Sequence, residues 1–210
     1  IPIDQIVGTK SGGRSNAFAG NFMPILRENT EFAYKWATLS QSHINEGIRD
    51  PIKAYEYMNK FYVEEGNKRV SVLKYFKADS IVANVTRKIP KYSEDEDVKL
   101  YYEYMMFIQI SGLTNIEFSK IGMVDTLLAR MGSTAIWDAD TRMEFNSLVN
   151  HFTKAYEFRG GRKLPIRVGD ALTAFINVYG YNTVLGMSDD ELSLNIVKCW
   201  NEFVMLTEKQ

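Results

Sequence analysis

The pattern of apolar residues changes once along this chain, near residue 92, and that change limits what the chain can fold into. Before it, short alternating runs typical of strands are mixed with helical spacings, in the order strand, helix, strand, strand, helix, strand. After it, apolar residues recur at helical spacing, apart from one short extended stretch at "LPIRV". The sequence therefore predicts an α+β protein with two domains, a small mixed-sheet domain over residues 1–92 and an all-α domain over residues 93–210.

Turn and cap signals place the elements of the first domain. The opening "IPIDQIV" predicts a strand, and "ENTEFAYKWATLSQSHINEG" predicts a helix that ends at Gly47. Pro51 opens an extended run, Asn59–Lys60 gives a tight turn, and "FYVEE" returns as the hairpin partner. From about Arg69 to Phe76 the spacing becomes helical again, and "SIVANVTRKIP" predicts the last strand.

Charge and composition exclude several classes of protein. The net charge is −1, but residues 1–92 carry +5 and residues 93–210 carry −6, so a phosphate-bearing ligand is expected in the first domain. No apolar run reaches the length of about 18 residues that a membrane span needs. The single cysteine, Cys199, excludes an internal disulfide, and its helical surroundings predict a buried structural thiol. These features favour a cytoplasmic protein, and the start at Ile1 suggests a piece of a longer chain.

A glycine and two cations stand where the hairpin gives way to a helix, in "FYVEEGNKRVSVLKYF". The start of a helix exposes backbone N–H groups and carries a positive partial charge, so it binds anions. A glycine there allows close approach, a lysine supplies a point charge, and an arginine can bond two phosphate oxygens at once. Two further cations lie in the glycine-rich loop after the first strand. The predicted phosphate- or nucleotide-binding residues are Gly66, Asn67, Lys68, Arg69, Lys10 and Arg14.

Two acids precede this motif and are the candidate catalytic residues. Glu64 or Glu65 could act as a general base or help to hold Mg²⁺ beside a nucleotide, and strand alternation predicts that only one of them faces the site. Solvated acids at a strand end are the simpler interpretation. Tyr55 and Tyr57 share a strand face, where they could pack on the sheet or stack a base. No His or Cys spacing predicts a metal site.

The order of these parts resembles the ParB-like N-terminal domain of the ParB/sulfiredoxin superfamily. The matching features are the helix ending at Gly47, the strand opening at Pro51, the glycine-x-x-arginine of Gly66 to Arg69, the following helix and the strand from Ile81. The resemblance covers about residues 1–90 and implies that the motif binds nucleotide phosphates. The glycine-rich loop also resembles bacterial proteins in which such a module precedes a basic-membrane-protein-type ligand-binding domain.

Two departures from the family narrow the expected function. Sulfiredoxins carry a catalytic cysteine after the glycine, where this chain has Asn67, so thiol chemistry is not expected. Partitioning proteins carry an Asn and Arg motif at a later helix start, where this chain has the acidic "KYSEDEDVKLYY". An acidic helical half is also a poor reader of DNA, because phosphate contacts dominate DNA affinity.

We therefore expect a nucleotide- or phosphate-binding ParB-like regulatory module, with a helical half that mediates protein contacts. DNA association, as in transcriptional regulation, is a weaker expectation, and a homodimer through residues 93–210 is another. The alternatives are an ATP-dependent phosphotransferase or nuclease on the same scaffold, and a non-catalytic structural module.

Overall fold

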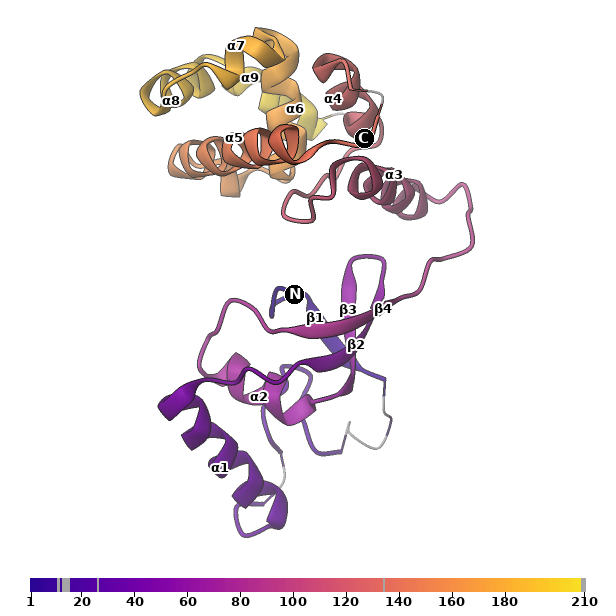
Figure 1. Cartoon of the computed structure of the whole chain (residues 1–210), viewed down its shortest axis with the longest axis vertical. Helices are drawn as coiled ribbons and strands as arrows, with labels where there is room; N and C mark the ends of the chain where they lie inside the picture. The colour runs from indigo at the N-terminus through magenta and orange to yellow at the C-terminus, as the bar shows by residue number, and fades with distance from the viewer. Residues whose placement is uncertain (11, 13–15, 26, 134, 209–210) are drawn as a thin grey trace. The chain divides into compact units, whose positions relative to one another are not determined.

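The computed structural model describes residues 1–10, 12, 16–25, 27–133 and 135–208. The chain divides into two compact units, residues 1–91 and residues 92–210, called unit 1 and unit 2 below (Figure 1). Unit 1 contains a four-stranded sheet and two helices, and unit 2 is built from helices, so the fold is mixed α+β. In the part of the chain that is described, no helix is both long and apolar enough to span a membrane.

Unit 1 is a mixed sheet with the strand order β1-β3-β2-β4. The central strands β2 and β3 pair antiparallel as a hairpin, while β1 joins β3 and β4 joins β2 in parallel. The elements of unit 1 are β1 (Ile6–Thr9), α1 (Glu31–Glu46), β2 (Ile52–Tyr57), β3 (Lys60–Glu65), α2 (Asn67–Tyr75) and β4 (Ala83–Arg87).

The hairpin confirms the predicted pairing but corrects the turn by one residue. Met58 and Asn59 both have positive φ, +52° and +60°, which is the conformation of a two-residue turn that matches the twist of its strands. The predicted turn at Asn59–Lys60 is therefore wrong, and Lys60 begins β3. The first strand also starts later than predicted, at Ile6, while Pro2 forms only an isolated bridge.

One helix packs on the sheet and the other packs on that helix. Val70 and Leu73 of α2 share a buried apolar cluster with Ile52, Ala54 and Val63 of the sheet. Helix α1 then contacts α2, where the Trp36 indole donates a hydrogen bond to Ser71 Oγ at 2.9 Å. Helix α1 has Thr30 as its N-cap, and it ends at Gly47, with φ of +78°, where the sequence predicted its end.

Unit 2 follows the predicted helical periods closely. The stretch "SEDEDVKLYYEYMMFIQISG" predicts an N-cap at its first residue, Ser93, but the N-cap is Asp95. The helical spacing of "DDELSLNIVKCWNEFVMLTEK" predicts a helix that is in fact broken at Cys199. The stretch "LPIRV" forms bends before a helix rather than a strand. The elements of unit 2 are α3 (Glu96–Ser111), α4 (Met123–Met131), α5 (Ala139–Phe158), the 3₁₀ turn η2 (Gly161–Lys163), α6 (Val168–Tyr179), α7 (Tyr181–Leu185), α8 (Asp189–Lys198) and α9 (Trp200–Glu208).

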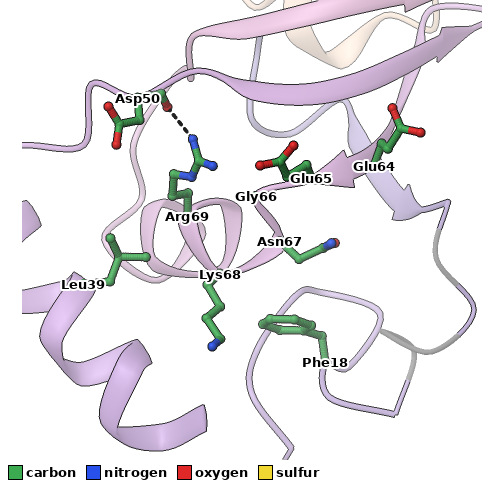
Figure 2. A pocket seen from close by; sticks show the side chains of 9 residues that line it. All are labelled: Phe18, Leu39, Asp50, Glu64, Glu65, Gly66, Asn67, Lys68 and Arg69. Atoms are coloured by element: carbon green, nitrogen blue, oxygen red, sulfur yellow. Dashed lines mark hydrogen bonds between the residues drawn. The ribbon is translucent and has the colours of Figure 1, made fainter. Parts of the chain in front are cut away.

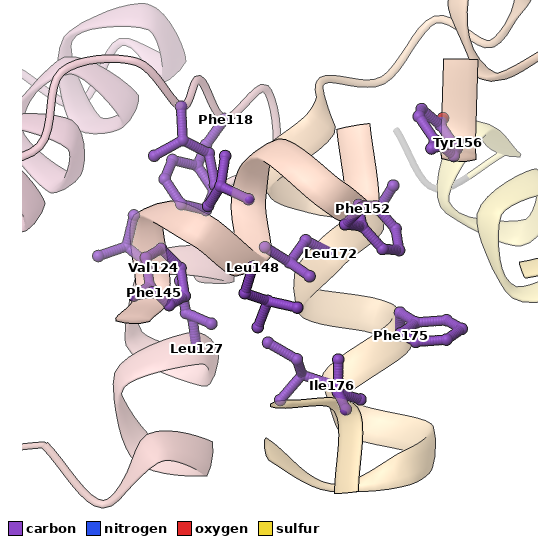
Figure 3. Packing of buried hydrophobic residues seen from close by; sticks show 14 of the residues in the cluster. Phe118, Val124, Leu127, Phe145, Leu148, Phe152, Tyr156, Leu172, Phe175 and Ile176 are labelled. Carbon is purple, nitrogen blue, oxygen red and sulfur yellow. The ribbon is translucent and has the colours of Figure 1, made fainter. Parts of the chain in front are cut away.

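Aromatic rings fill the core of unit 2 (Figure 3). Phe152 stacks on Tyr156 at 5.7 Å between centroids and packs against Phe175 at 5.3 Å. Phe145 packs edge-on against Trp137 at 5.0 Å. Such ring pairs add to the stabilisation that comes from apolar burial. This core contains residues of unit 2 alone and is separate from the apolar cluster of unit 1.

Candidate functional site

The predicted phosphate motif lies at the junction between β3 and α2. Helix α2 begins at Asn67, two residues earlier than the periodicity predicted, so Asn67, Lys68 and Arg69 form its first turn. Gly66 is the N-cap, with φ of +103°. A Cβ atom on Gly66 would lie 2.5 Å from Ile52 Cγ2. Both the left-handed backbone and the lack of space require glycine here.

A pocket of about 390 Å³ opens at this helix start (Figure 2). Its wall is assembled from five separate segments of unit 1: the loop before α1, α1 itself, the loop before β2, the end of β3, and the first turn of α2. The residues that line this pocket, called the α2 pocket below, are Phe18, Leu39, Asp50, Glu64, Glu65, Gly66, Asn67, Lys68 and Arg69.

Asn67 carries the least satisfied polar group of this pocket. Its side chain is only 6% exposed, and its Oδ1 atom is buried without a hydrogen-bond partner. Figure 2 shows the side chain extending from the helix start toward the space beneath β3. Buried polar atoms are nearly always bonded, and leaving one unpaired costs about 1–3 kcal/mol. The Oδ1 atom of Asn67 therefore has no partner among the described residues, and a water molecule or a ligand could supply one.

The two cations of the motif are held in place by the protein. Arg69 Nη1 donates to the backbone carbonyls of Asp50, at 3.0 Å, and Pro51, at 2.6 Å. Part of the guanidinium thus fixes the entry into β2, and the rest borders the pocket (Figure 2). Lys68 Nζ lies 4.7 Å from the centre of the Phe32 ring, a cation–π contact that directs the ammonium toward α1. Both charges remain within the wall of the α2 pocket.

Both candidate catalytic acids line the pocket, so the expectation that only one would face the site is wrong. The register of the hairpin shifts beside Lys53, opposite the end of β3, which removes strict alternation there. A hydrogen bond from Lys10 holds the pKa of Glu64 below its usual value, and one from Lys53 does the same for Glu65. A carboxylate with a lowered pKa is a weak base, so this geometry does not favour general-base catalysis.

Lys10 lies beside the site rather than in the pocket wall. Its backbone N–H donates to Val63 O at 2.8 Å, and its ammonium donates to Tyr55 Oη at 2.8 Å and Glu64 Oε1 at 2.9 Å. The pairing of β1 with β3 thus brings Lys10 next to one lining residue, Glu64. Arg14, the other predicted loop cation, lies outside the described residues.

Sequence reasoning missed three residues of the pocket. Phe18, Leu39 and Asp50 come from segments far from the motif in sequence, and no local pattern marks them as lining residues. Among the described residues, no group of three or more His, Cys, Asp or Glu side chains is arranged to hold a metal ion.

Comparison with known proteins adds no further assignment to this geometry. No family model matches the chain, and no curated protein matches it.

Proposed function

We propose that unit 1 is a ParB/sulfiredoxin-like domain that binds the phosphate groups of a nucleotide, or of another phosphate-bearing ligand, in the α2 pocket. One observation carries this proposal: the α2 pocket opens at the positive N-terminal end of α2, beside the buried side-chain amide of Asn67. A helix start and two cations, Lys68 and Arg69, supply the charge that an anion needs. The role is a regulatory one, in which ligand binding is sensed rather than followed by chemistry.

The parts of the pocket suggest how the ligand would be held. The phosphate would lie at the helix N-terminus, where the free N–H groups of the first turn and the positive partial charge of α2 favour an anion. Asn67 would bond a donor of the ligand through Oδ1, and its amide orientation could reverse to donate to a phosphate oxygen. Phe18 and Leu39 offer apolar surface for a base or another non-phosphate part.

The test is a thermal melt of the chain with nucleoside mono-, di- and triphosphates and inorganic phosphate, with and without Mg²⁺. A ligand that binds only the folded state stabilises it by about 2.7 kcal/mol at 100 times its Kd. We expect one of these ligands to raise the Tm, and titration calorimetry to confirm saturable binding. No rise in Tm at millimolar ligand, together with no calorimetric signal, would refute the proposal.

Asn67→Asp locates the site, because it places a negative charge of nearly the same shape where the phosphate is expected. We expect the shift in Tm to disappear in this variant. The matched control is Asn150→Asp, which adds the same charge at an exposed position on α5. A ligand that binds Asn67→Asp as well as it binds the parent chain must bind elsewhere.

DNA association and a homodimer through residues 93–210 stay predictions.

The alternative function, an enzyme that transfers phosphate or cleaves nucleic acid, has a direct test. Phosphotransferase or nuclease activity would require Mg²⁺-dependent turnover that is lost in Glu64→Gln or Glu65→Gln. Hydrogen bonds from Lys10 and Lys53 lower the pKa values of Glu64 and Glu65, which disfavours a general base but leaves both acids ionised as Mg²⁺ ligands would be.

A further inference from the structure

The sheet of unit 1 has one face that its helices do not cover. Alternation along β2 buries Ile52, Ala54 and Glu56 and turns Lys53, Tyr55 and Tyr57 to the opposite face. The apolar cluster that packs the sheet against α2 takes its β2 and β3 members from the buried side, and Figure 1 shows both helices together on one side of the sheet.

Three tyrosines gather on this uncovered face. Tyr62 of β3 lies directly opposite Tyr55 in the antiparallel ladder, and Tyr57 lies opposite Lys60 at the end of the hairpin. Gly8 of β1 is the neighbour of Tyr62, and a Cβ atom there would lie 3.2 Å from the Tyr62 ring. The absence of a side chain at Gly8 therefore leaves room for the ring to lie against β1.

Four lysines surround these rings. The ammonium of Lys10 lies 4.1 Å from the centre of the Tyr55 ring, and that of Lys88 lies 5.3 Å from it. Lys60 joins the face through its place opposite Tyr57, and Lys53 through its place on β2. The following residues make up this surface, which we call the open sheet face: Lys10, Lys53, Tyr55, Tyr57, Lys60, Tyr62 and Lys88.

The acids near this face neutralise only part of its charge. Glu64 pairs with Lys10 at 2.9 Å, and Glu65 pairs with Lys53 at 2.8 Å. Within the described part of the chain, Lys60 and Lys88 form no ion pair, and both are exposed. Exposed ion pairs contribute little free energy, so the phosphates of a polyanion can replace Glu64 at Lys10 and Glu65 at Lys53.

We propose that the open sheet face binds single-stranded nucleic acid, with unpaired bases stacked on the tyrosines and phosphates held by the lysines. Aromatic rings in a cationic surface are the combination that binds single strands with little sequence preference. Tyrosine is also enriched at protein interfaces, but lysine is depleted there. Duplexes hide the faces of their bases, so a sheet face with an exposed ring at Tyr57 and half-buried rings at Tyr55 and Tyr62 favours an unpaired strand. None of the seven residues of this face lines the α2 pocket, although Glu64 and Glu65 of that pocket pair with Lys10 and Lys53.

The experiment measures binding of fluorescein-labelled 15-nucleotide oligothymidine and oligouridine by fluorescence anisotropy, from 50 to 300 mM salt. We expect both to bind at low salt, with log K falling linearly against log salt by about 0.7 per phosphate contact. Lys60→Gln/Lys88→Gln should make that slope shallower by about 1.4, the value for two lost contacts. Tyr57→Ala should weaken binding about fivefold or more, while Tyr57→Phe should keep it.

Matched controls separate this face from the rest of the surface. Lys154→Gln/Lys163→Gln removes two exposed cations from unit 2, and Tyr34→Ala removes an exposed ring from α1. We expect both to bind like the parent chain. Absence of binding at 50 mM salt, equal loss in the controls, or equal affinity for a duplex of the same length would each overturn the proposal. A thermal melt of every variant confirms that it is folded.

Discussion

Each unit buries a polar side chain in the first turn of a helix, and the two side chains differ in what they bond. Asp170, in α6 of unit 2, is fully buried and accepts hydrogen bonds from the backbone N–H groups of Ser119, Lys120 and Arg167 and from Ser119 Oγ. Asn67, in α2 of unit 1, is nearly as buried, yet its Oδ1 has no partner. The Asp170 carboxylate is therefore bonded within the protein, whereas the Asn67 Oδ1 atom is not.

An unpaired atom is not enough to mark a site. The hydroxyl groups of Tyr156 and Tyr181 are also buried without partners, but their rings lie in or against the aromatic core of unit 2. Asn67 differs because it lines a pocket that also contains a helix start and two cations. The contrast with Asp170 therefore rests on surroundings as well as on hydrogen bonds, and it can be tested by substitution.

The largest effect is expected at Asp170. Asp170→Ala leaves three buried or partly buried N–H groups, those of Ser119, Lys120 and Arg167, without their acceptor. We expect the free energy of unfolding of unit 2 to fall by about 3 kcal/mol or more, as measured by urea denaturation followed by circular dichroism. Asp125→Ala is the control, because Asp125 is an exposed acid in the first turn of α4. Similar losses in the two variants would contradict a structural role for Asp170.

Gly66→Ala should cost nearly as much, but in unit 1. The new Cβ would collide with Ile52, and alanine is strained at φ of +103°. We expect a loss of about 2–3 kcal/mol in the free energy of unfolding, from overpacking added to backbone strain. The control is Gly132→Ala, where φ is +66° but no atom lies within 4 Å of the new Cβ, so only the strain of about 1 kcal/mol applies. Equal losses would show that space at Gly66 is not limiting.

Cys199 can report which unit each substitution affects. Burial raises the pKa of its thiol to about 11, so at pH 8 it is almost entirely protonated and slow to react in the folded protein. We expect a thiol reagent to label Cys199 faster in Asp170→Ala than in the parent chain. Gly66→Ala should leave the rate unchanged, because each unit has its own core. Equal acceleration in both variants would show that the two units unfold together.

The sequence predicts local features of this chain well. Helical spacing with a terminal glycine located α1, and alternation located both strands of the hairpin. These features depend on residues close together in the chain. The exact turn at Met58 and Asn59 was missed, because methionine gives no signal for a left-handed conformation. The break at Cys199 was missed for a similar reason, since the apolar spacing continues through it.

The candidate site likewise contains residues that the sequence could locate and residues that it could not. Gly66 to Arg69 could be found from the sequence, because a glycine before a cationic helix start is a local pattern. Phe18 and Asp50 could not, because only the fold brings their segments to α2. The sequence also did not predict the hydrogen bonds from Arg69 to two backbone carbonyls. These bonds give Arg69 a role in the fold as well as in the pocket wall. Substitution of Arg69 would disturb the fold as well as the pocket, so it is a poor test of binding.

Asn67→Ala should have the smallest effect on stability, and this is the sharpest form of the comparison with Asp170. Alanine removes a buried oxygen that bonds nothing, and it is a better helix former, which offsets the lost side-chain packing. We expect the free energy of unfolding of unit 1 to change by less than about 1 kcal/mol in urea denaturation. The same variant should lose about tenfold in affinity for the phosphate-bearing ligand. A loss of stability like that of Asp170→Ala would mean that Asn67 supports the fold. The Asn67 side chain would then no longer be evidence that the α2 pocket binds a ligand.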